Sequence, residues 1–170
     1  MTYQNTKEMT DAVKPAASVL SDRVSVTNPS AVTGDLVDRL VRTSVFGADA
    51  ELKGTARWIL RNLAAAAGIR PASIHDLYLA MGRGDAGGFT VPAINVRAMA
   101  YDTARAVIRA AMKLNAGAFI FEIARSEIGY TEQRPHEYAA VVLGAALREG
   151  FTGPLFIQGD HVQTLSLIHI

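Results

Sequence analysis

The spacing of apolar residues changes along the chain and divides it into regions of different character. Between residues 33 and 88, apolar positions recur every three or four residues in the stretches 36–45, 52–63 and 74–81. This period is typical of helices that bury one face. We therefore expect an all-helical N-terminal region over residues 33–88.

Residues 1–32 show no sustained apolar period and mix Thr, Ser, Asn, Pro and Ala. The sequence Asn28-Pro29-Ser30 within this stretch is turn-forming. We expect residues 1–32 to be a flexible or loosely helical arm that carries no chemistry.

Short runs of strand-forming residues alternate with longer helical stretches in the second half of the chain. The runs 89–96, 118–123 and 155–158 are separated by helical patterns over 102–115 and 135–149. The second run is apolar at successive positions, as expected of a parallel strand that is covered on both faces. The order β-α-β-α-β predicts an α/β fold with a parallel sheet, because such crossovers join parallel strands.

Composition and charge exclude several classes of function. The chain of 170 residues has no cysteine, which excludes a disulfide scaffold and a cysteine-ligated metal site. Its 17 Lys and Arg nearly balance 16 Asp and Glu, so we expect no nucleic-acid partner. The sequence has no signal-peptide pattern and no apolar run of about 18 residues. We therefore expect no membrane partner and a cytoplasmic location.

The ligand site of a parallel sheet lies at the carboxyl ends of its strands. Three polar stretches follow the predicted strands there, at residues 95–97, 125–134 and 159–161. The pair Asp160-His161 is the most informative, because a carboxylate and an imidazole beside a buried strand are costly unless each has a partner or a task. A loop aspartate beside a solvated histidine is an equally weighted alternative.

Glu122 stands in the otherwise apolar run 118–123, where a carboxylate is costly unless it is hydrogen-bonded or lies at the mouth of the sheet. The loop predicted to follow is longer than most βα connections. It holds four more polar side chains, Glu127, Tyr130, Glu132 and His136. The residues leave open whether this loop is functional or merely polar.

Three segments, 91–96, 118–123 and 156–161, resemble the first three βα units of the class II, metal-dependent fructose- and tagatose-bisphosphate aldolases. The resemblance covers about residues 74–163. It implies a partial TIM (β/α)8 barrel, with its first three βα units in residues 89–163, behind the helical N-terminal region.

The resemblance also implies site residues by their position in these segments. His161 resembles the first zinc ligand and Asp160 the acid/base residue, while Asn95 and Glu122 fall at substrate-binding positions. The implied cofactor is zinc, with its other ligands beyond the end of this chain. Where many members carry Gln-x-Ser at the end of the second strand, this chain has Glu122-Ile123-Ala124, so the serine contact is missing.

The activity that the resemblance implies is reversible aldol cleavage of fructose 1,6- or tagatose 1,6-bisphosphate to dihydroxyacetone phosphate and glyceraldehyde 3-phosphate. A zinc-stabilised enediolate would be the intermediate, and the phosphorylated sugar the small-molecule partner. We expect the full-length protein to be a homo-oligomer. The alternative is a non-catalytic aldolase-like subunit or scaffold, a kind that the tagatose-bisphosphate branch includes.

The predicted barrel strands within this chain number three of the eight that the resemblance implies. We therefore expect the chain to be a truncated fragment that is inactive by itself. The ending 164–170 is apolar and departs from the family pattern. We expect this tail to be unrelated to the family and do not count His169 as a ligand.

Overall fold

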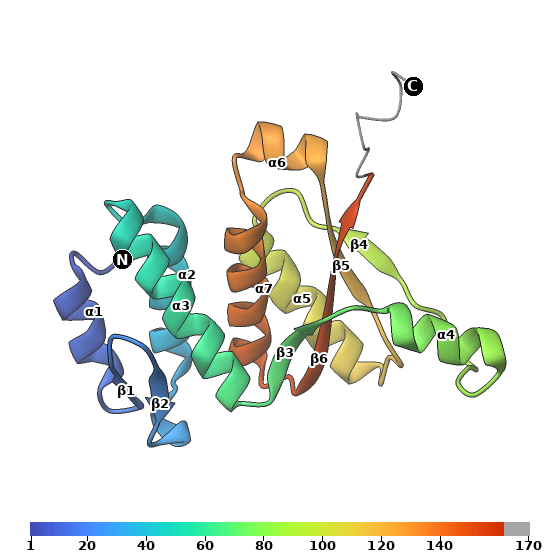
Figure 1. Cartoon of the computed structure of the whole chain (residues 1–170), viewed down its shortest axis with the longest axis horizontal. Helices are drawn as coiled ribbons and strands as arrows, with labels where there is room; N and C mark the ends of the chain where they lie inside the picture. Colours follow the sequence, from blue (N-terminus) through green and yellow to red (C-terminus); the bar gives the residue numbers. More distant parts are fainter. Residues whose placement is uncertain (162–170) are drawn as a thin grey trace.

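The computed structural model describes residues 1–161 of the chain (Figure 1). Its elements in chain order are α1 (Thr6–Val13), β1 (Ala17–Val19), β2 (Val24–Val26), the 3-10 turn η1 (Pro29–Ala31), α2 (Gly34–Phe46), α3 (Ala50–Ala66), β3 (Ile69–Ala72), α4 (His75–Arg83), β4 (Ala93–Asn95), α5 (Ala100–Lys113), β5 (Ile120–Ala124), α6 (Arg125–Thr131), α7 (Pro135–Glu149) and β6 (Gly153–Asp160). The predicted tail 164–170, with His169, lies outside the described residues.

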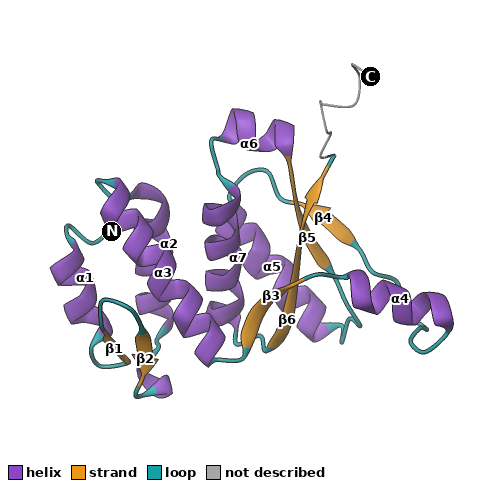
Figure 2. Cartoon of the chain, viewed as in Figure 1, coloured by secondary structure: helices purple, strands orange, loops and turns teal. Residues whose placement is uncertain are grey.

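A four-stranded sheet with the order β3-β6-β5-β4 forms the centre of the fold, and all its neighbouring strands are parallel. This confirms the predicted α/β class and the predicted parallel sheet. The crossover helices α5 and α7 pack against each other, and α2 and α3 pack against α7 (Figure 2). Phe121 and Ile123 of β5 belong to the same core as Tyr138 of α7, so this face of the sheet is covered.

The opposite face of the sheet is partly open. A shallow cavity of about 280 Å³ lies over it and is lined by apolar side chains that include Ile74, Ile120 and Phe156. Helix α4 extends away from the sheet in Figure 1 and has no buried residue. Within residues 1–161 no helix has the length and apolar character needed to cross a bilayer.

The expectation of an all-helical region over residues 33–88 is wrong at β3. Helices α2, α3 and α4 form as expected, but Ile69–Ala72 is a strand that pairs in parallel with β6. Pro71 lacks a backbone N–H and would weaken a central strand. Because β3 is at the edge of the sheet, that missing donor is tolerated.

Residues 1–32 are not a flexible arm. Asn5 caps α1 by accepting a hydrogen bond from the backbone N–H of Glu8, at 2.9 Å. The strands β1 and β2 then form an antiparallel pair. Met9 and Val13 are fully buried in the main core. The apolar residues here are too sparse to give a helical period, yet packing against α2 and α3 orders them.

Candidate functional site

Three strands bring the predicted site residues to the carboxyl edge of the sheet. Asn95 ends β4, Asp160 ends β6, and Glu122 lies within β5 between them. Asn95 is in register with Glu122, and Glu122 is in register with Gln158 of β6. The side chains of Asn95, Glu122 and Gln158 therefore form a row across the sheet, a carboxylate between two amides. We call it the polar row below Asp160, because Gln158 precedes Asp160 by two residues on β6.

The Asp160 carboxylate has two partners at this edge. Its Oδ2 accepts a hydrogen bond from Asn95 Nδ2 at 2.8 Å, and His161 Nδ1 lies 2.8 Å from the same oxygen. The hydrogen bond from Asn95, and then the one from His161, hold the pKa of Asp160 below its usual range. These two contacts therefore favour the ionised form of Asp160, which is the form of a carboxylate that can accept a proton.

Asn95 and His161 each have a feature that favours a role in ligand binding. Asn95 Oδ1 is buried and has no hydrogen-bond donor within residues 1–161, an unusual state for a buried polar atom. His161 has a positive φ of 50°, and its side chain is 82% exposed. Since the imidazole contacts Asp160 through Nδ1, its Nε2 is left for another partner.

Glu122 is buried and has a polar partner that the sequence interpretation missed. Gln158 Nε2 donates a hydrogen bond to Glu122 Oε1. The Glu122 backbone carbonyl accepts a second bond, at 2.9 Å, from the hydroxyl of Tyr138. The cost of placing a carboxylate within the sheet is therefore offset by an amide from the neighbouring strand.

A third carboxylate, that of Glu127, has a structural role at the same edge. Its Oε1 accepts a hydrogen bond from Arg97 Nε at 2.6 Å, and its Oε2 accepts one from the Ala124 backbone N–H at 2.9 Å. Glu127 is 3% exposed. Arg97, in the β4–α5 loop, is exposed, and its pKa is raised mainly by Glu127 and to a smaller extent by the charge of Asp160.

The predicted loop over residues 125–134 is mostly the helix α6, so this expectation is wrong. Tyr130 and Glu132 are exposed at the end of α6, and His136 lies in the first turn of α7. An acidic residue in the first turn is typical of a helix N-terminus. That signal at Glu127 could have identified α6.

The residues present do not form a zinc site by themselves. Across the described range, no three His, Asp or Glu side chains lie close enough together to hold a metal ion. His75 begins α4 and His136 is the second residue of α7, and neither joins Asp160 and His161 in such a group. A zinc site in a protein needs three or four side chains as ligands.

Comparisons with protein-family models, with curated proteins and with solved structures found no match to this chain. The chemistry assigned to the carboxyl edge of the sheet therefore rests on the residues found there. Asp160 can accept a proton, Asn95 holds its carboxylate in place, and Arg97 adds a positive charge beside it. The site is a candidate for general acid–base chemistry on a polar ligand.

Proposed function

We propose that this chain is part of a class II aldolase-type lyase, in which Asp160 exchanges a proton with a hydroxyl group of a ketose bisphosphate. The observation that carries the proposal is the ionised Asp160 carboxylate, held by Asn95 at the carboxyl end of a parallel strand. In aldol cleavage the hydroxyl group becomes an aldehyde as the C–C bond breaks, so a base must take its proton. Asp160 has the charge and position for that task.

The arrangement of the strands supports a partial (β/α)8 barrel as part of the proposal. Strands β4, β5 and β6 are neighbours in chain order, joined by helices on one face, as the first three units of a barrel would be. Strand β3 differs from that scheme. It occupies the place beside β6 that the next strand of a barrel would take.

Two further side chains, the implied zinc ion and one of its ligands also have roles in this proposal. Glu122 and Asn95 would contact hydroxyl groups of the sugar, because their side chains belong to the polar row below Asp160. Zinc, when bound, would stabilise the negative charge of the enediolate. His161 would supply one of its ligands, and residues 1–161 do not complete its coordination. A cytoplasmic location and a homo-oligomeric parent belong to the same proposal.

The test is calorimetric titration of the full chain with fructose 1,6-bisphosphate and with tagatose 1,6-bisphosphate. We expect saturable binding of at least one sugar, weakened about tenfold by Asp160→Ala through loss of a charge-assisted hydrogen bond. Asp85→Ala is the control, because Asp85 is exposed and pairs with Arg83. Binding that is absent, or equally weakened by both variants, would exclude the proposal.

A second candidate is the non-catalytic aldolase-like subunit or scaffold. The observation that favours it is the incomplete metal site, because no group of three His, Asp or Glu side chains within residues 1–161 could hold a metal ion. Zinc binding with one equivalent per chain, together with sugar binding, would support the enzyme. A stable complex with a separate catalytic chain, without zinc or sugar binding, would support the scaffold.

A further inference from the structure

A cavity of about 500 Å³ lies outside the proposed catalytic edge. Its walls come from α2, from the start of α5 with the loop before it, and from the α6–α7 connection. Neither Asn95 nor Asp160 lines it, and Arg97 is a lining residue whose pKa is also affected by the charge of Asp160. Its use is therefore not explained by acid–base chemistry at Asp160.

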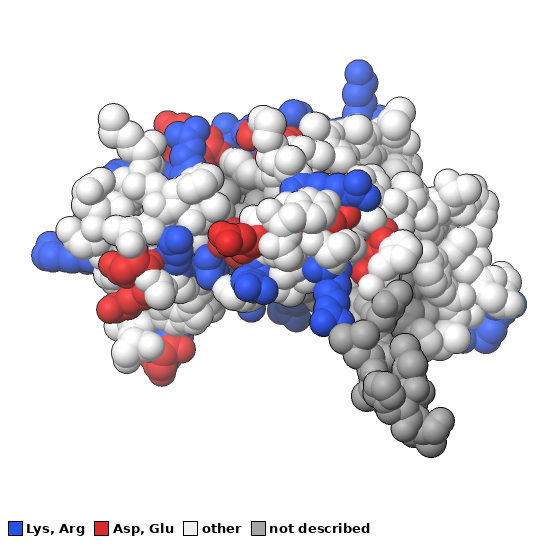
Figure 3. Space-filling model, turned by 90° about the horizontal axis from the view of Figure 1, so that it is seen from above, with Lys and Arg blue, Asp and Glu red and all other residues white. Residues whose placement is uncertain are grey.

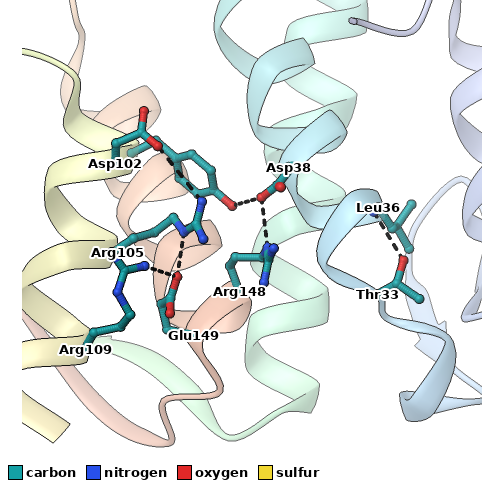
Figure 4. A network of polar contacts seen from close by, with 9 residues as sticks. Thr33, Leu36, Asp38, Asp102, Arg105, Arg109, Arg148 and Glu149 are labelled. Atoms are coloured by element: carbon teal, nitrogen blue, oxygen red, sulfur yellow. Dashed lines mark hydrogen bonds and ion pairs between the residues drawn. The ribbon is translucent and has the colours of Figure 1, made fainter. Parts of the chain in front are cut away.

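Two of the three acidic residues in the walls of this cavity, Asp38 and Glu137, have close positively charged or hydrogen-bonding partners, whereas Asp102 is exposed. Asp38 accepts hydrogen bonds from the hydroxyl of Tyr101, at 2.5 Å, and from Arg148 Nε, at 3.1 Å (Figure 4). Glu137 accepts a bond from Arg57 at 2.5 Å. Their negative charges are thus largely offset by residues around the cavity.

Two arginines in the walls keep donors available. Arg42 is exposed, and it forms no ion pair or hydrogen bond with another side chain within residues 1–161. Arg97 uses Nε for Glu127, which leaves its two terminal guanidinium nitrogens. Figure 3, which views the molecule from the side of α6, shows basic side chains gathered across the middle of this face with acidic ones among them. Planar guanidinium groups of this kind suit phosphate and carboxylate ligands.

The first turn of α5 adds further donors to the same cavity. The residue that caps this 14-residue helix is Met99, which has no side-chain oxygen to accept from the free N–H groups of the first turn. Met99 also has a positive φ of 49°, a strained conformation for a residue with a side chain. The first turn of α5, whose N–H groups have no side-chain cap and carry partial positive charge, thus lines the same cavity as the two arginines.

Large apolar side chains stand at the same place. Phe46, at the end of α2, is 74% exposed, and Met99 is 73% exposed. Both line the cavity, together with Val45. Exposed apolar groups beside free cationic donors are suited to a ligand that has both an anionic and an apolar part.

We propose that this cavity is a binding site for an amphipathic organic anion. Its phosphate or carboxylate group lies between Arg42, Arg97 and the first turn of α5, and its apolar body lies against Phe46 and Met99. The proposal does not depend on aldolase activity, because Asn95, Glu122 and Asp160 are not among the lining residues.

The test is a titration of the full chain with 1-naphthyl phosphate, in which binding is monitored through the NMR chemical shifts of the backbone amides. We expect saturable shifts at residues 99–102, and binding at least about tenfold tighter than that of inorganic phosphate or 1-naphthol alone. Arg42→Gln should weaken binding about tenfold, whereas the exposed hairpin variant Arg23→Gln should leave it unchanged. Asp102→Asn should tighten binding, since that exposed carboxylate lies in the first turn of α5.

A parallel titration with 1-naphthoate shows which anion the site prefers, and tighter binding of either probe supports the proposal. Shifts confined to the open sheet face around Phe156 would overturn it. Equal weakening by Arg42→Gln and Arg23→Gln would overturn it as well. Both arginines are exposed, so these variants are expected to fold, and Phe46→Ser offers a further variant at an exposed position.

Discussion

The side-chain amide of Asn95 donates a hydrogen bond to the Asp160 carboxylate across an intervening strand, over 2.8 Å. Asn95 belongs to β4 and Asp160 to β6, and β5 lies between them. The β5 residue in register with Asp160 is Ala124, whose single methyl group leaves room for the bond to pass. This contact joins the two outer strands of the β4-β5-β6 unit and lowers the pKa of the proposed base.

Removal of the Asn95 amide should raise the pKa of Asp160. Because the pKa of the folded form is depressed, ionised Asp160 stabilises the fold above about pH 4, and this stability is lost as the pH falls through the folded-state pKa. Asn95→Ala should reduce the part of the folding stability that depends on ionised Asp160, and His161→Ala should reduce it by a smaller amount. The measurement is an NMR titration of the Asp160 carboxyl carbon, with Asn28→Ala as the control. An unchanged pKa in Asn95→Ala would contradict the account.

The second half of the chain could be predicted well because its patterns are strong. All five residues of β5 are buried, and this shows in the sequence as an unbroken apolar run apart from Glu122. Helix α7 was predicted with its observed bounds, since Pro135 begins it and Gly150 follows its last residue. Long periodic segments between such signals leave few alternative assignments.

The features that the sequence did not reveal depend on tertiary contacts. Strand β3 has four residues and includes Pro71, and its pairing with β6 is what makes it a strand. The pairing of Asn95 with Asp160 joins residues 65 positions apart, and the burial of Glu127 depends on Arg97 from another loop. A single sequence predicts that such residues lie at one sheet edge, but not which of them will form a pair.

The close approach of α2 and α7 depends on Gly144. A Cβ atom at this position would lie 2.4 Å from Val41 Cγ2 in the core. We expect Gly144→Ala to lower the free energy of unfolding by about 1–3 kcal/mol, as overpacked cores do. Gly54→Ala is a matched control, since a Cβ there meets nothing within 4 Å in the helix α3, and it should stabilise by about 0.5–1 kcal/mol. Urea unfolding measures both, and equal effects would show that the helix contact is looser than described.

Glu127 should stabilise the turn from β5 into α6. Glu127→Ala leaves the buried Ala124 N–H without its acceptor, which should cost about 1–3 kcal/mol. Glu127→Gln keeps an oxygen for that N–H but loses the ion pair with the exposed Arg97, and should cost less. Hydrogen exchange of the Ala124 amide measures the effect directly. Similar exchange rates in wild type and Glu127→Ala would argue against this role.

Tyr101 should make the protein sensitive to alkali. Burial, and then the hydrogen bond to Asp38, raise the pKa of Tyr101 above its usual value. The associated stability is present below about pH 10 and is lost as the pH rises through the folded-state pKa. Tyr101→Phe should be less stable at pH 7 but lose less stability between pH 7 and pH 11 than the wild type, as measured by urea unfolding at each pH. The half-exposed Tyr78 provides the control variant Tyr78→Phe, which should keep the wild-type pH dependence.

The central claim is that a ketose bisphosphate binds at the Asn95–Asp160 pair. The most direct measurement is the NMR signal of the Asn95 side-chain amide during titration of the ¹⁵N-labelled chain with fructose 1,6- or tagatose 1,6-bisphosphate. The account predicts a saturable shift of this signal that gives the same affinity as calorimetry, and binding about tenfold weaker by the same signal in Asp160→Ala. Sugar binding that leaves the Asn95 amide signal in place, or no binding of either sugar, would contradict it.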